Sequence, residues 1–174
     1  MVAHSGDIFV TDGHEVESNN RVVKFSRDGS QLMSWGTTGS DPGEFLVPHA
    51  IGIDSQGRVI VADRDNGRVQ VFDQQGEFLE EWPQFGLATG LYIAAADKLY
   101  VSDNQSNAAT NPGWARGIRV GSATDGSVAD FIADAGFDPS ISAATGAHGV
   151  AANVAGDIFG AEVGATTVRR YSRR

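Results

Sequence analysis

The chain has 174 residues, of which 41% are hydrophobic, and carries a formal net charge of −9 at neutral pH. This length fits one domain with a real core, and the acidic balance argues against nucleic acid as a partner. There are no cysteines, so any metal must be held by His, Asp or Glu. No segment has the pattern of a signal peptide or of a membrane span, so no membrane partner is expected. The compartment stays open, and a secreted or periplasmic parent protein is one option.

The first predicted repeat covers residues 1–35. Its second strand is expected over 7–12 and its third over 21–25, because β-branched and aromatic residues dominate both runs. Asp28-Gly29 then supplies a tight turn into a fourth strand. The few residues before these strands hold only the tail of a first strand, so this repeat is expected to be incomplete.

The second repeat, residues 47–86, is the most complete. Four short strands are expected over 47–54, 59–63, 68–72 and 77–82. The turns between them contain Ser-Gln-Gly, Asp-Asn-Gly and Gln-Gly, which allow the tight conformations that a hairpin requires. This stretch therefore predicts a four-stranded antiparallel meander.

The same pattern recurs in two further repeats, residues 89–133 and 147–174. Their second and third strands are expected over 98–103, 117–120, 157–162 and 167–171. The acids that close the four second strands, and that we expect to fix the turns after them, are Asp12, Asp63, Asp103 and Glu162. They lie 51, 40 and 59 residues apart along the chain.

A repeat of this size, built from one antiparallel meander, is typical of a β-propeller blade. The sequence thus predicts an all-β fold, a single partial β-propeller over residues 1–174 with about four blades, two complete and two partial. Incomplete end blades leave open strand edges, which a closed propeller does not have. We therefore expect either a longer parent propeller or self-association through the incomplete blades.

The segments between blades are expected to be loops. Residues 36–46, 104–115 and 134–146 are rich in Gly, Ser, Pro, Asn and Ala. Loops on one face of a propeller usually carry its function. A peptide substrate or a protein partner on this loop face is therefore predicted.

Two of the four histidines, His49 and His148, occupy the same place in the repeat, at the start of a first strand. The first strand is the innermost of a blade, so both side chains are expected to point toward the propeller axis. That geometry would let them converge on one metal ion. A catalytic zinc takes three protein ligands and a water, of which two are visible here. The alternative is that each histidine is a polar residue lining a wet channel.

Two stretches carry a resemblance to a known family. They are Gly-Glu-Phe-Leu-Val-Pro-His at 43–49 and Val-Ala-Asp-Arg-Asp-Asn-Gly-Arg-Val-Gln at 61–70. They resemble the peptidyl-α-hydroxyglycine α-amidating lyases, whose fold is a six-bladed propeller of NHL-type repeats. The similarity runs over nearly the whole chain and implies an N-terminally truncated member.

The resemblance implies a zinc ion held by three histidines, each in a motif that opens a blade. His49 matches the second of these ligands and His148 the third, while the first falls upstream of Met1. Arg64 matches one of two arginines that contact the substrate carboxylate and hydroxyl. The second arginine also falls upstream.

The chain departs from the family at three positions. The catalytic tyrosine is replaced by His14, which could act as a base because imidazole titrates near neutrality. The alternative for His14 is a solvated loop histidine. Gly149 stands where an acidic residue helps to bind calcium, so the resemblance does not support calcium, and Ala147 replaces the proline before the third histidine.

The reaction that the resemblance implies is cleavage of the C–N bond of a peptidyl-α-hydroxyglycine to a peptide amide and glyoxylate. The zinc site is incomplete in this chain, so enzyme activity is left open. The alternative is a non-catalytic NHL-repeat propeller that binds a peptide or protein through its loop face, because the fold does not decide between the two.

Overall fold

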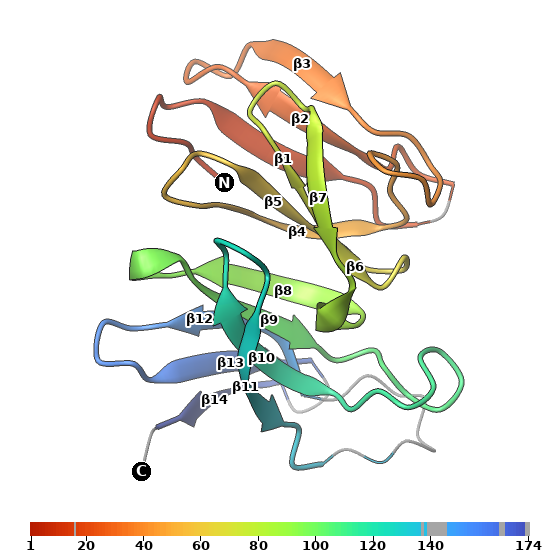
Figure 1. The fold of residues 1–174 in the computed structure, drawn as a ribbon, viewed down its shortest axis with the longest axis vertical. Coiled ribbons are helices and arrows are strands. Elements are labelled where there is room, and N and C mark those ends of the chain that lie inside the picture. Colours follow the sequence, from red (N-terminus) through yellow and green to blue (C-terminus); the bar gives the residue numbers. More distant parts are fainter. Residues whose placement is uncertain (16, 137, 139–145, 164–165, 173–174) are drawn as a thin grey trace. The chain divides into compact units, whose positions relative to one another are not determined.

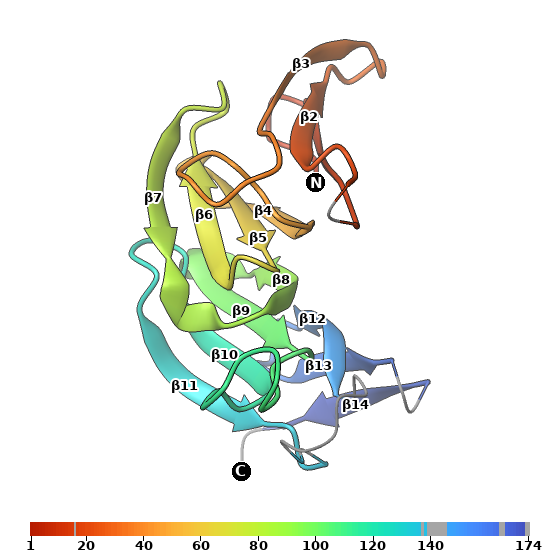
Figure 2. The same cartoon turned by 90° about the vertical axis from the view of Figure 1, so that its right-hand side faces the viewer.

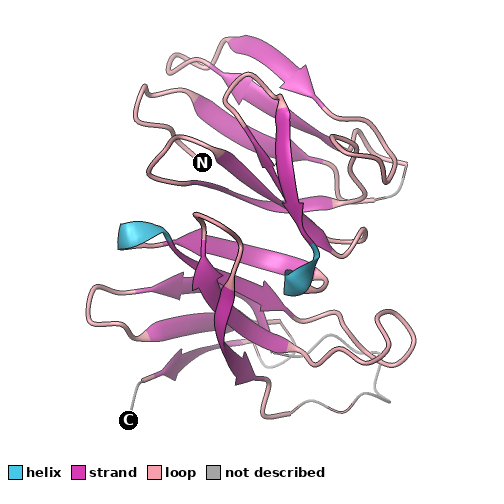
Figure 3. Ribbon diagram, viewed as in Figure 1, coloured by secondary structure: helices cyan, strands magenta, loops and turns pink. Residues whose placement is uncertain are grey.

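The computed structural model describes residues 1–15, 17–136, 138, 146–163 and 166–172. Within these residues the chain is all-β, with fourteen strands and two short 3₁₀ helices (Figures 1 and 3). The strands are β1 (Ile8–Asp12), β2 (Arg21–Phe25), β3 (Gln31–Trp35), β4 (Pro48–Ile53), β5 (Val59–Asp63), β6 (Arg68–Phe72), β7 (Phe78–Trp82), β8 (Ala88–Ile93), β9 (Lys98–Asp103), β10 (Gly117–Ser122), β11 (Val128–Ala133), β12 (Ala147–Ala152), β13 (Ile158–Glu162) and β14 (Thr167–Tyr171). The 3₁₀ helices are η1 (Pro83–Phe85) and η2 (Ala95–Asp97).

The described strands form four antiparallel sheets. β4 to β7 and β8 to β11 make two four-stranded sheets, and β1 to β3 and β12 to β14 make two three-stranded ones. In every sheet the neighbours follow chain order, which is the meander of a propeller blade. The predicted all-β propeller, with two complete and two partial blades, is confirmed. The tail of a first strand is also present, as a bridge between Val2 and Ile8.

The chain divides into two compact units of two sheets each. Residues 1–83 contain β1 to β7, and residues 84–174 contain β8 to β14. In the first unit β1 packs beside β4, and in the second β12 packs beside β8 and β9. Figure 2 shows β11 at the outer edge of its sheet, with β10, β9 and β8 following in order.

Each unit has its own apolar core. In residues 1–83 the strands β5 and β6 are buried along their whole length, whereas β3 and β7 are largely exposed or half-exposed. The core of this unit consists of Ala3, Phe9, Val22, Phe45, Val59, Val61 and Phe72. The core of residues 84–174 consists of Tyr100, Ile118, Val120, Ala147 and Ile158. Both cores draw side chains from two sheets, so each blade is stabilised by its neighbour.

The expected tight turns lie between the third and fourth strands. Gly29 and Gly76 have φ angles of 87° and 85°, in the left-handed region that favours glycine. In the second of these turns, Asp73 Oδ1 accepts hydrogen bonds from the backbone N–H groups of Gln75 (2.8 Å) and Glu77 (2.9 Å). Such side-chain acceptors satisfy backbone donors that the hairpin leaves unpaired.

Of the three expected loops, residues 36–46 and 104–115 connect strands and contain no strand of their own, apart from one bridge between Thr38 and Phe45. In the third, 134–146, residues 137 and 139–145 lie outside the described part of the chain.

Candidate functional site

His49, a predicted metal ligand, lies on a β-bulge at the start of β4. The pairing with β5 runs from Pro48 opposite Asp63 to Ala50 opposite Ala62, which leaves His49 as the extra residue. The side chain is half-buried. A bulge re-aims the side chain of its extra residue, and bulges are common next to active sites.

His148, the second predicted ligand, lies on an equivalent bulge in the unit of residues 84–174. Here Ala147 pairs with Glu162 and Gly149 with Ala161, so His148 is the extra residue of β12. Its side chain is half-buried. Strand β8 in the same unit has the same irregularity, and Thr89 occupies the bulge there. The bulge is therefore a recurring feature of the first strands, and two of its three described positions carry histidine.

Another predicted site residue, His14, lies beside His49. It is an exposed residue of the loop between β1 and β2, and the centres of the two imidazole rings are 5.4 Å apart, with the planes tilted by 50°. The structure thus brings together two residues that are 35 positions apart in the sequence. His148 belongs to the other unit.

The His14 loop is tied to the start of β4 by a buried residue, Asn20. Its side chain is fully buried, and its φ angle of 46° is left-handed. Asn20 Oδ1 accepts the backbone N–H of Val47 (3.0 Å), and Nδ2 donates to Thr38 Oγ1 (2.9 Å) and to the carbonyl oxygen of Glu15 (3.4 Å). Glu15 directly follows His14, and Val47 directly precedes β4. The Asn20 side chain therefore links the loop that carries His14 to the segment that leads into β4.

Sequence reasoning missed Asn20. Its partners Thr38 and Val47 lie 18 and 27 residues away in the sequence, and no local pattern predicts contacts between residues so far apart. The only signal in the sequence is an asparagine directly before a strand, in a position where a left-handed residue is tolerated.

Asp63, at the end of β5, lies opposite Pro48 and binds the segment that leads into β4. It is fully buried and accepts hydrogen bonds from the backbone N–H of Leu46 (2.7 Å) and from the side chains of Asn66 (2.8 Å), Arg68 (2.9 Å) and Gln70 (3.1 Å). Burial raises the pKa of the Asp63 carboxyl above its ordinary value, and the hydrogen bonds from Asn66, Leu46 and Arg68 act in the opposite direction. This carboxylate therefore holds the segment that leads into β4.

The expectation that the recurring acids fix the following turn is confirmed for Asp63 and Asp103. Asp103 closes β9 and accepts hydrogen bonds from the backbone N–H groups of Gln105 (3.1 Å) and Ser106 (2.9 Å). The same chemistry at the same place in two blades identifies these acids as structural residues.

Arg64, the predicted cationic clamp, is the first residue after β5. Its backbone N–H donates to the carbonyl oxygen of Val47 (3.3 Å), which places it against the segment that precedes His49. Its Nε donates to Asp65 Oδ1 (2.7 Å), and the side chain is 14% exposed. The Nη groups make no hydrogen bond or ion pair with the residues that the structure describes. An arginine held through Nε still presents its Nη atoms to a planar carboxylate.

No group of three or more His, Cys, Asp or Glu side chains that could hold a metal ion occurs within the described ranges. The His14 and His49 pair offers two imidazole nitrogens in one unit, and His148 offers one in the other. Imidazole is a common ligand of zinc, so the donor type at these positions fits the ion.

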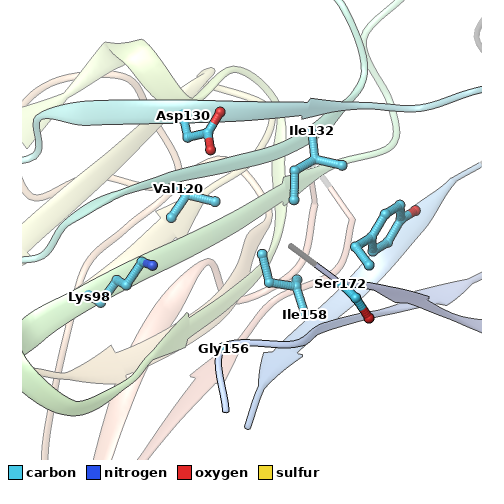
Figure 4. Close-up of a pocket in the computed structure, with 8 residues that line it drawn as sticks. Lys98, Val120, Asp130, Ile132, Gly156, Ile158 and Ser172 are labelled. Carbon is cyan, nitrogen blue, oxygen red and sulfur yellow. The ribbon is translucent and has the colours of Figure 1, made fainter. Parts of the chain in front are cut away.

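A separate cavity of about 280 Å³ lies in the unit of residues 84–174. Figure 4 shows Asp130 and Ile132 on one side of it and Gly156, Ile158 and Ser172 on the other. The full lining consists of Lys98, Val120, Asp130, Ile132, Gly156, Ile158, Tyr171 and Ser172. It contains none of the predicted site residues and is lined by both sheets of this unit, from β9, β10 and β11 on one side and from β13 and β14 on the other, so we interpret it as exposed blade core.

The blade that contains His49 and Arg64 also carries a similarity to a known family. Residues 45–72, which span β4 to β6, match the NHL repeat family. The chain is 46% identical over 82 residues to NHL repeat-containing protein 3 from Homo sapiens, over 47% of this chain and 23% of that protein. It is 42% identical over 74 residues to a Caenorhabditis elegans protein named probable peptidyl-alpha-hydroxyglycine alpha-amidating lyase pgal-1, over 41% of this chain and 20% of that protein. The chain thus matches less than a quarter of the length of either relative.

Solved structures support the fold. The WD40 beta propeller domain of Doa1 superimposes with a TM-score of 0.68 over 99% of this chain and 49% of that chain, at 14% identity. The superposition shows a shared β-propeller fold, and at such low identity it says nothing about function. No helix in the described part of the chain is long and apolar enough to cross a membrane.

Proposed function

We propose that this chain, which carries an NHL repeat in a β-propeller fold, is a zinc-dependent lyase acting on peptidyl-α-hydroxyglycines. The reaction cleaves the C–N bond and gives a peptide amide and glyoxylate. The observation that carries the proposal is the equivalent bulge at His49 and His148, two histidines at the same place in two blades. The identity to the relative named as a probable amidating lyase supports the substrate class.

His49 and His148 would each offer an imidazole nitrogen as a zinc ligand. When bound, zinc stabilises negative charge that develops on a substrate oxygen. The bulges fix the direction of both side chains through backbone pairing, so the ligands are positioned by the sheets and not by flexible loops. Rigid placement of this kind is what a binding or catalytic site requires.

Arg64 would bind the carboxylate of the substrate. A carboxylate is planar and matches the two Nη groups of a guanidinium, which form two parallel hydrogen bonds with it. The Nε bond to Asp65 and the backbone bond to Val47 hold the side chain before substrate arrives. Glyoxylate carries the same carboxylate as the substrate, so this contact serves to position the bond that breaks.

His14 has two chemical options beside His49. It can accept the hydroxyl proton of the substrate, or it can share the metal ion with His49. The two options exclude each other for one ring nitrogen, because a lone pair that binds a metal ion cannot also bind a proton.

A second candidate function is a non-catalytic propeller that binds a peptide or protein. The 46% identity to NHL repeat-containing protein 3, whose name specifies no reaction, favours this alternative. In that case the half-buried His49 would contact the bound peptide, and Arg64 would bind an acidic group without turnover.

The proposed function is tested by the loss of turnover in Arg64 variants. We expect Arg64→Ala to lower the rate of glyoxylate release from an N-acyl-α-hydroxyglycine by about 10²–10³, as expected for removing a charge-stabilising donor. Arg64→Lys should restore only part of the rate, because an ammonium group cannot form the bidentate contact. Arg27→Ala, at an exposed arginine of the β2–β3 turn, is the matched control and should react like the unmodified chain. Equal rates for Arg64→Ala and the unmodified chain would exclude Arg64 from the site.

A further inference from the structure

The sheet of β12 to β14 differs from the two four-stranded sheets at its outer edge. In those sheets a fourth strand, β7 or β11, covers the third strand, β6 or β10. β6 is buried along its whole length, and β10 over its first four residues. β14 is the third strand of its own sheet, yet four of its five residues are exposed, and no strand of the described residues pairs with its outer edge. An edge strand presents unpaired backbone N–H and C=O groups, to which another strand can bind.

β14 corresponds to β6 residue by residue. Both are five-residue strands that pair in full with the second strand of their sheet. The last residue of β6, Phe72, lies opposite Val59, and the last residue of β14, Tyr171, lies opposite Ile158. Tyr171 therefore takes the place of Phe72.

In the unit of residues 1–83 the fourth strand closes this place. Phe78 of β7 lies directly opposite Phe72, and the centres of the two rings are 6.0 Å apart. The ring centre of Trp35, from the neighbouring blade, is 5.9 Å from that of Phe72. In the unit of residues 84–174 the corresponding place is the cavity of about 280 Å³, which is lined by Tyr171, Ile132 and others and is shown in Figure 4. The cavity is thus where an aromatic side chain of a fourth strand would pack.

The open strand is basic, although the chain has a formal net charge of −9. Arg169 Nε lies 3.0 Å from Glu162 Oε1, and Arg170 Nη2 lies 2.9 Å from Asp157 Oδ2. The arginine side chains are still 43% and 61% exposed. Because a guanidinium carries five N–H donors, each arginine can bind a further carboxylate. Neighbouring residues of a strand point to opposite faces, so one positive charge lies on each face of the sheet.

The fourth strand of the other unit has side chains that would complement this edge. The sequence of β7 is Phe-Leu-Glu-Glu-Trp, and its glutamates, Glu80 and Glu81, lie opposite the fourth and third residues of β6. The fourth and third residues of β14 are Arg170 and Arg169. A strand with the pattern of β7 would therefore place one acidic side chain opposite each arginine and its phenylalanine beside the cavity.

We propose that the outer edge of β14 binds an extended acidic segment of a partner protein as a fourth, antiparallel strand. The segment carries an aromatic residue for the cavity beside Tyr171, then one further residue, then two acidic residues that bind Arg170 and Arg169. Addition of a strand to an open sheet edge is a common mode of peptide recognition. A second copy of the chain is a poorer occupant, because two paired β14 strands would bring the arginines of both copies together. The edge contains none of the residues of the proposed lyase site, so this proposal is independent of that function.

The proposal is tested with a labelled synthetic peptide whose binding to the full chain is followed by fluorescence anisotropy. The peptide has the sequence of residues 76–82, Gly-Glu-Phe-Leu-Glu-Glu-Trp. A second peptide carries the change Glu80→Lys, and a third contains the residues of the first in scrambled order. The chain is compared with Arg170→Glu and with Arg27→Glu, a matched control at an exposed arginine of the β2–β3 turn. Circular dichroism checks that each variant is folded, and hydrogen exchange locates the bound peptide.

We expect the first peptide to bind saturably and to slow the exchange of the β14 amide protons. Arg170→Glu should lower its affinity by about tenfold, because the change replaces an attraction across the two strands by a repulsion. The Glu80→Lys peptide should bind this variant better than the first peptide does, and Arg27→Glu should bind like the unmodified chain.

Three results would overturn the proposal. One is no saturable binding of the first peptide, and another is equal affinity for the ordered and scrambled peptides or for Arg170→Glu and the unmodified chain. The third is a dimer in sedimentation equilibrium whose β14 amides are protected without peptide, since a second copy would then cover the edge.

Discussion

Replacing Phe72 by alanine is expected to lower the free energy of unfolding by about 3–5 kcal/mol, the range for removing a large aromatic side chain from a core. Phe72 is fully buried on β6. The centre of its ring lies 5.9 Å from that of Trp35, 5.5 Å from Phe45 and 6.0 Å from Phe78. These partners belong to two sheets and the loop between them, so the substitution leaves a cavity where the two blades meet.

Urea denaturation followed by tryptophan fluorescence measures this loss, because Trp35 is a direct neighbour of Phe72. Leu79→Ala is the matched control on the adjacent strand β7, where the side chain is 49% exposed. It should change the free energy of unfolding by less than about 0.5 kcal/mol. Similar losses for the two variants would contradict the assignment of Phe72 to a shared core.

Asp63→Ala is expected to lower the free energy of unfolding by about 3–5 kcal/mol, the range for breaking a buried ion pair by removing one partner. The carboxylate is completely buried and is hydrogen-bonded by four donors, of which Arg68 is charged and almost fully buried. Its loss would leave the Arg68 guanidinium and the Leu46 N–H without this acceptor. The segment that leads to His49 would lose its anchor at the same time.

Glu81→Ala is the control for Asp63→Ala, because Glu81 binds the same arginine. Arg68 Nη1 donates to Glu81 Oε2 (2.7 Å), but the Glu81 side chain is 44% exposed. An exposed ion pair contributes at most about 1 kcal/mol. Denaturation of both variants at pH 7 separates the two roles, and a loss in Glu81→Ala as large as that in Asp63→Ala would show that charge pairing and not burial sets the effect.

Most of the strand pattern could be predicted from the sequence. The runs 59–63 and 68–72 are continuous β-branched and aromatic stretches between turn residues, and they became the fully buried strands β5 and β6. The turn glycines were also predictable, since Gly29 and Gly76 adopt the positive φ angles that their turns require. These features depend on local sequence, which is why a single chain reveals them.

The site was only partly predictable. The repeat put His49 and His148 at the same place, but it did not reveal the bulge that carries each of them. A bulge is a shift in pairing with another strand, and it has no fixed local signature. The approach of His14 to His49 depends on Asn20, whose contacts are distant in sequence. Contacts of this kind are set by tertiary packing and not by the residues around them.

The most direct test of the proposed lyase is product formation by the zinc-loaded chain. An N-acyl-α-hydroxyglycine is incubated with the chain, with the chain after a chelator has removed the metal, and with the chain after zinc has been restored. The proposal predicts glyoxylate and acyl amide in equal amounts, lost with the metal and regained with zinc. If the chain binds zinc but the substrate breaks down only at its uncatalysed rate, the result would contradict the lyase and favour the peptide-binding propeller.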